Sequence, residues 1–72
     1  MKKTFRIEDL DCAHCAAKME DAIRKIEGVT AAGLNFMTQK LTIEADDSVF
    51  DRVVKEAVAA CAKIEPDATI VL

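Results

Sequence analysis

Two spacings of apolar residues, one typical of strands and one typical of helices, follow each other along this chain. Their order is compatible with few folds. Strict alternation of apolar and polar residues is typical of a half-buried strand, whereas apolar residues three and four positions apart indicate a helix. The chain shows these patterns in turn, predicting a strand at residues 3–8, a helix at 15–26, strands at 32–36 and 41–45, a helix at 50–64 and a strand at 68–72. Gly28 is expected to end the first helix and Pro66 the second.

This order predicts an α+β fold, the ferredoxin-like βαββαβ sandwich, with two helices on a four-stranded antiparallel sheet. The 72 residues have room for one hydrophobic core only, so residues 1–72 are expected to form a single domain. Hydrophobic residues make up 51% of the chain and charged residues 32%, with only two glycines and one proline, which indicates a compact globule and not a disordered tail.

Charge and cysteine content exclude several classes of function. The net charge is −3 and the basic residues are scattered among acidic ones, so we expect no nucleic-acid partner and no anionic membrane surface. No apolar run approaches the roughly 20 residues of a membrane span, so this segment is not expected to insert into a membrane. Three cysteines, two of them close together, do not suit a secreted disulfide framework. Reduced thiols in a cytoplasmic domain fit better.

The pair Cys12 and Cys15 carries the chemistry of the chain. It lies between the first predicted strand and helix, where amides at a helix N-terminus favour thiolates. Two intervening residues allow both sulfurs to bind one thiophilic metal ion. A structural zinc finger would need a second such pair, and haem attachment would need a histidine where Ala16 stands. Thiol–disulfide exchange remains an alternative for a dithiol of this type.

The residues around this pair resemble a known family, the heavy-metal-associated domain. The resemblance spans essentially the whole chain and rests on four segments, Leu10–Glu20, Ile26–Val29, Asn35–Phe36 and Gln39–Ile43. The Asp-Cys-x-x-Cys-Ala form, together with Lys63–Pro66, is similar to the N-terminal domain of cadmium-, zinc- and lead-translocating P-type ATPases. Copper-binding members typically carry Met two residues before the first cysteine. Leu10 stands there in this chain, which argues against copper(I).

The resemblance implies a metal loop at one end of the sheet, with Cys12 and Cys15 as thiolate ligands and Asp11 as a carboxylate ligand. Chemistry favours this set for zinc(II), which accepts oxygen ligands and binds about four groups, whereas two soft sulfurs satisfy copper(I). Asp11 could instead cap the first helix. His14 and Cys61 are minor candidates, because the position of His14 usually faces solvent and Cys61 lies on the apolar stripe of the second helix.

The resemblance thus predicts a cytoplasmic domain that binds a divalent soft metal ion, zinc, cadmium or lead, as the N-terminal module of a metal-exporting ATPase. Its partners would be the metal ion and the transport domain of the pump in the cell membrane. The domain itself is expected to be non-catalytic, because the chain carries no P-loop or phosphorylation motif. A free-standing metallochaperone of the same fold and a dithiol redox protein remain alternatives, and the sequence does not rank the three metals.

Overall fold

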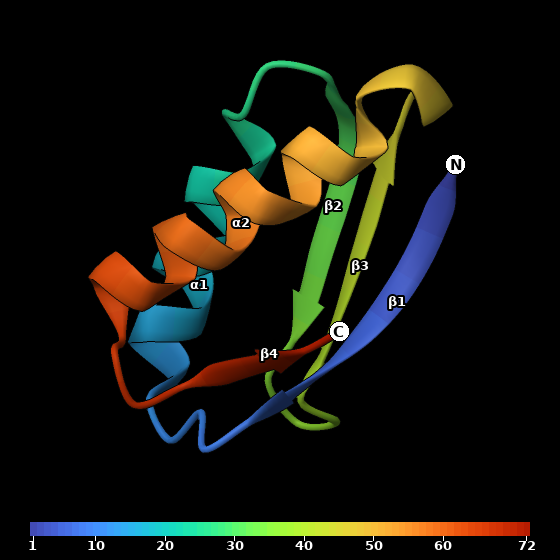
Figure 1. Ribbon diagram of the computed structural model, residues 1–72. Helices are drawn as coiled ribbons and strands as arrows, with labels where there is room; N and C mark the ends of the chain where they lie inside the picture. The colour runs from blue at the N-terminus through green and yellow to red at the C-terminus, as the bar shows by residue number, and fades with distance from the viewer.

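The computed structural model describes residues 1–72 and confirms the predicted fold (Figure 1). Its elements are β1 (Lys2–Glu8), α1 (Ala13–Arg24), β2 (Val29–Asn35), β3 (Lys40–Ala45), a short 3₁₀ helix η1 (Asp47–Val49), α2 (Phe50–Ile64) and β4 (Thr69–Val71). Both helices cover one face of a four-stranded sheet with the strand order β2-β3-β1-β4. No helix has the length and apolar character needed to cross a membrane.

The sheet register determines which loops lie together. β1 is a central strand that pairs antiparallel with β3 over Lys2–Arg6 and with β4 over Arg6–Glu8. Because Glu8 pairs with Thr69, the loop that leaves β1 and the loop that enters β4 meet at one end of the sheet. Figure 1 shows the start of α1 and the end of α2 at this same end.

The core lies between the sheet and the helices and contains no polar side chain. Alternate strand residues point into it, as the sequence pattern predicts, and they meet the apolar stripes of α1 and α2. The buried residues are Phe5, Ile7, Leu10, Ala16, Met19, Ile23, Ala32, Leu41, Ile43, Ala45, Phe50, Val53, Ala57 and Cys61. Leu10 is the one member that lies in a loop between elements, and its complete burial fixes the backbone just before the cysteines.

The first helix ends earlier than the sequence pattern predicts. α1 stops at Arg24, so Ile26 packs against the core from the following turn and not from the helix. Gly28 belongs to that turn, with a φ of 101°. The left-handed backbone favours glycine, and a Cβ atom there would also lie only 3.0 Å from Cγ2 of Val49, a tight contact.

The β2–β3 turn forms without the glycine that most tight hairpins use. Phe36, predicted to continue the strand, lies in the turn. The side-chain oxygen of Asn35 accepts hydrogen bonds from the backbone N–H groups of Met37 at 2.9 Å and Thr38 at 3.2 Å. Gln39 supplies the left-handed residue, with a φ of 54°. The hairpin prediction is therefore confirmed.

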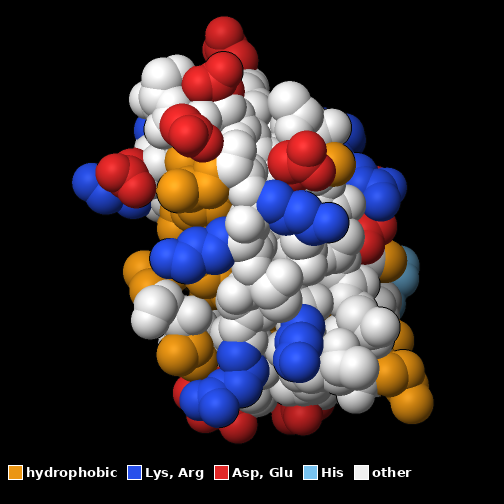
Figure 2. Space-filling view, turned by 90° about the vertical axis from the view of Figure 1, so that its right-hand side faces the viewer, with side chains coloured by type: hydrophobic (Ala, Val, Ile, Leu, Met, Phe, Trp, Pro, Cys, Tyr) orange, Lys and Arg blue, Asp and Glu red, His pale blue; other side chains and the backbone are white.

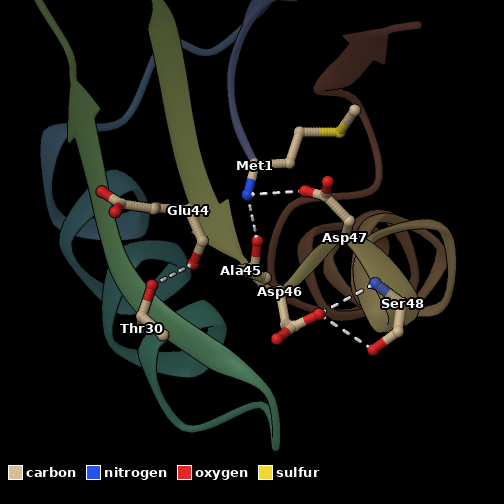
Figure 3. A network of polar contacts seen from close by, with 7 residues as sticks. All are labelled: Met1, Thr30, Glu44, Ala45, Asp46, Asp47 and Ser48. Atoms are coloured by element: carbon tan, nitrogen blue, oxygen red, sulfur yellow. Dashed lines mark hydrogen bonds and ion pairs between the residues drawn. The ribbon is translucent and has the colours of Figure 1, made fainter.

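The opposite end of the domain is held by polar contacts (Figure 3). Asp46 accepts hydrogen bonds from the backbone N–H and the hydroxyl of Ser48, at 3.0 and 2.9 Å, and these bonds lower the pKa of its carboxyl group. The N-terminal ammonium donates to the carbonyl of Ala45 at 2.6 Å and lies 2.9 Å from the carboxylate of Asp47. These contacts fix the entry to α2 far from the cysteine loop.

Candidate metal-binding loop

Cys12 and Cys15 lie together at the start of α1. Cys12 is the N-cap of the helix, with extended backbone angles, and its sulfur accepts a hydrogen bond from the backbone N–H of Cys15 at 3.1 Å. The alternative that Asp11 caps this helix is therefore wrong, because Cys12 occupies the capping position. Asp11 is exposed and its carboxylate has no hydrogen bond or ion pair that would hold it in place.

The two thiols differ in acidity. The pKa of Cys12 is lowered because its sulfur accepts hydrogen bonds from the thiol and then from the backbone N–H of Cys15. The pKa of Cys15 is raised to about 11, first because its thiol donates to Cys12, then by desolvation and by the charges of Cys12 and Glu65. The pair therefore loses its first proton from Cys12 and holds the second until strongly alkaline pH, or until a metal ion displaces it.

This asymmetry predicts an order of thiol reactivity. At about pH 7.5 the thiolate fraction of Cys12 should exceed that of Cys15, and thiolates are the nucleophiles in alkylation. We expect iodoacetamide to modify Cys12 at least about tenfold faster than Cys15, one pKa unit corresponding to a tenfold change in thiolate at this pH. Cys61 is 3% exposed, and burial raises its pKa to about 11, so it should react only after denaturation. Peptide mass mapping of quenched samples measures all three rates, and rapid labelling of native Cys61 would contradict the structure.

Glu65 also lies at this end of the sheet, and the sequence reasoning did not single it out as a site residue. It directly follows α2, and its backbone N–H donates to the carbonyl of Cys61 at 2.9 Å. Its carboxylate raises the pKa of Cys15, both by its charge and as a hydrogen-bond acceptor. The predicted topology could have identified Glu65, because it requires the second helix to end beside the loop that carries the cysteines.

The structure brings the two predicted thiolate ligands together but no third ligand with them. No group of three or more His, Cys, Asp or Glu side chains converges closely enough to hold a metal ion. Asp11 and His14 are exposed beside the thiols, whereas Cys61 is buried in the core. A third protein ligand would therefore have to turn toward the sulfurs when an ion binds, and Asp11 is unrestrained enough to do so.

The loop is an exposed surface feature and not a cleft. Hollows on the outer face of the sheet, around Thr4, Gly33 and Thr42, do not include the cysteines. Seen from the side of the sheet, Asp and Glu side chains gather mainly at the top and bottom of the view, and Lys and Arg side chains lie mainly between them (Figure 2). A half-buried thiol pair in a surface loop, outside any substrate cleft, is suited to binding and transferring an ion, which needs access for an exchanging ligand.

A βαββαβ scaffold that presents two thiols on a surface loop is typical of a small metal-binding module. Comparison with known families agrees with this class. The family described as "Heavy-metal-associated domain" matches residues 4–64, and the chain belongs to this family. The resemblance noted from the sequence is therefore confirmed.

Individual relatives include both pumps and chaperones. The chain is 42% identical over 48 residues to a probable cadmium-transporting ATPase of Listeria monocytogenes, covering 67% of this chain and 7% of that protein. It is 37% identical over 46 residues to a zinc/cadmium/lead-transporting P-type ATPase of Escherichia coli K12, covering 64% of this chain and 6% of that protein. Among solved structures, a CopZ metallochaperone superposes with a TM-score of 0.76 at 25% identity, covering 99% of this chain and 100% of that one.

These relatives confirm the fold and heavy-metal binding as the class of function. The chain spans only 6–7% of the length of the two ATPases it matches. Relatives named for copper occur beside those named for cadmium and zinc, so family membership alone leaves the metal open.

Proposed function

We propose that this domain reversibly binds one zinc, cadmium or lead ion in the cytoplasm and transfers it to the transport domain of a P-type ATPase. The supporting observation is the half-buried dithiol in the surface loop at the start of α1, in which hydrogen bonds from Cys15 lower the pKa of Cys12. Likeness to the cadmium-transporting and zinc/cadmium/lead-transporting ATPases supports the choice of metal and of partner.

Asp11 is the proposed third ligand. Two thiolates already neutralise a divalent ion, and zinc(II) completes its coordination readily with carboxylate oxygen. Asp11 adjoins Cys12, is exposed, and has no capping role that binding would disrupt. At the position where copper-binding members typically carry a methionine, Leu10 is fully buried and offers no sulfur. This donor set favours a borderline divalent ion over copper(I).

Capture and release follow from the proton held by Cys15. In the free protein the Cys15 thiol is protonated and donates to Cys12, whose pKa is lowered. An arriving ion therefore binds Cys12 more readily and then displaces the proton of Cys15. A competing thiolate from a partner can attack the bound ion, because the loop lies on the surface. Transfer then proceeds by exchanging one sulfur ligand at a time, without release of the bare ion.

A free-standing metallochaperone is the second candidate. It is favoured by the superposition on the CopZ metallochaperone, which covers 99% of this chain and 100% of that one. The loop chemistry is the same in both cases, so the distinction lies in the gene. A reading frame that continues beyond Leu72 into membrane segments would identify the pump module.

The proposal predicts proton release on zinc binding. Because Cys15 has a pKa of about 11, it is protonated in the free protein throughout the neutral range, and binding must release that proton. Calorimetric titration of the reduced protein in buffers of different ionisation enthalpy should show at least about one proton released per zinc. Affinity should fall about tenfold per proton for each pH unit below neutrality. An affinity that does not change between about pH 6 and pH 8 would exclude a thiolate site.

A redox role is tested on the same sample. A dithiol catalyst would cycle between oxidised and reduced forms at a potential close to that of the cytoplasmic thiol pool. If both thiols stay reduced and bind zinc at the potential of that thiol pool, the result supports a role in binding and transferring metal. Rapid oxidation of the pair in the presence of zinc would favour the dithiol alternative.

A further inference from the structure

Gln39, the last residue of the β2–β3 turn, contacts the metal-binding loop at the end of the sheet that the turn and the loop share. Its side-chain amide donates a hydrogen bond to the backbone carbonyl of Leu10, 29 positions away in the sequence. Its backbone carbonyl accepts a hydrogen bond from the N–H of Ile7 at 2.8 Å. One residue thus holds both the last part of β1 and the residue that precedes Asp11. Figure 1 shows the turn and the loop at the same end of the sheet.

The turn that carries Gln39 is a fixed support. Asn35 holds the N–H groups of Met37 and Thr38, so the turn has its own internal hydrogen bonds. On the other side of the contact, the side chain of Leu10 is completely buried in the core. The Gln39 amide therefore joins two positions that are each restrained independently.

The identity of the residue at position 39 also points to a role for its side chain. The backbone of Gln39 is left-handed, with a φ of 54°, a conformation that glycine adopts without steric cost and that a residue with a Cβ atom disfavours. Backbone geometry alone would favour glycine here. The glutamine side chain offsets that cost with an amide that reaches the Leu10 carbonyl.

We infer that Gln39 is a positioning residue for Asp11. The inference rests on the proposed function, in which Asp11 is the third ligand. Because a peptide unit is planar, fixing the carbonyl oxygen of Leu10 also fixes the nitrogen of Asp11 and the direction in which its Cα leaves the loop. The Asp11 carboxylate then has a smaller range of positions to search when it turns toward an ion on Cys12 and Cys15. Such pre-organisation raises affinity by reducing the entropy lost on binding.

The metals should respond differently to the loss of this contact. Zinc binding draws on Asp11 in addition to the thiolates, whereas copper(I) is satisfied by Cys12 and Cys15 alone. Loosening the Leu10–Asp11 peptide should therefore weaken zinc and leave copper(I) nearly unchanged. Selectivity, and not general affinity, is the property that Gln39 is expected to set.

Two substitutions distinguish the contribution of the Gln39 side-chain amide from that of its left-handed backbone. Gln39→Gly removes the amide and suits the left-handed turn, whereas Gln39→Met keeps a side chain of similar length without a donor. Both should lower zinc affinity about tenfold, the lower end of the effect of residues outside the coordination sphere, and should change copper(I) affinity less than about twofold. Thr38→Ala is the matched control and should change neither, because the side chain of Thr38 is exposed and makes no hydrogen bond.

A double-mutant cycle tests the route of the effect. Anaerobic competition titrations of wild type, Gln39→Gly, Asp11→Ala and the double variant should show that Gln39→Gly costs nothing further once Asp11 is gone. Equal losses for zinc and copper(I), or a full additional loss in the double variant, would overturn the inference, because Gln39 would then act on the whole loop. If the Gln39 variants bound zinc as tightly as the wild type while Asp11→Ala still weakened zinc, this inference alone would be overturned. Zinc binding that is indifferent to both Asp11 and Cys12 would overturn the proposed function as well.

Discussion

Replacing Cys12 or Cys15 with serine is expected to abolish tight zinc binding, with a loss greater than about 100-fold, the upper end of the effect of residues outside the coordination sphere. A serine hydroxyl stays protonated at neutral pH and is a poor ligand for a soft ion. Competition with a chromophoric zinc chelator under anaerobic conditions measures the loss. Serine at position 12 keeps a good N-cap for α1, so the Cys12→Ser variant should remain folded by circular dichroism.

Cys61→Ala is the matched control for these variants. Cys61 packs in the apolar core with 3% of its surface exposed, so alanine should lower the stability modestly while leaving zinc affinity within about twofold. Alanine is preferred to serine here because a buried hydroxyl without a partner would add a cost of its own. If all three substitutions reduced zinc affinity equally, Cys61 would belong to the site and the core assignment would be wrong.

Asp11→Ala is expected to weaken zinc by at least about 10–100-fold and copper(I) far less. With two thiolates, a third anionic ligand completes the coordination of a divalent ion but places excess negative charge beside copper(I). Cadmium and lead should lie between these limits, because sulfur dominates their binding. Competition titrations with chelators specific for each ion, run without oxygen, measure the four ratios.

Asp11→Asn is the control for this variant, because it removes the negative charge of the side chain while keeping its size. Because Cys12 caps α1, neither substitution at position 11 should change the free energy of unfolding by more than about 0.5 kcal/mol, the usual range at exposed positions. A large loss of stability would show that Asp11 supports the helix after all. If zinc and copper(I) weakened by the same factor, or neither changed, the ligand role of Asp11 would be excluded and metal preference would rest on family resemblance.

The order of strands and helices could be predicted from the sequence, because the buried face of a strand and that of a helix each repeat apolar residues at a characteristic spacing. Phe5 and Ile7 alternate with polar neighbours since one face of β1 meets the core and the other meets solvent. The end of α2 was equally clear, because Pro66 cannot continue a helix and Ile64 is indeed its last residue. The cysteine pair was recognisable too, since a metal loop requires both thiols within a few residues of each other.

The tertiary structure decided what depends on contacts between distant segments. The sequence placed both thiols at a helix N-terminus, which favours thiolates at both, but hydrogen bonding between them lowers the pKa of Cys12 and raises that of Cys15. Glu65 and Gln39 lie beside the loop only because the pairing of β1 with β4 and the β2–β3 turn carry them there. Local periodicity records which face of an element is buried, but it holds no information on which loop another loop will meet. That depends on sheet register, which the whole core determines together.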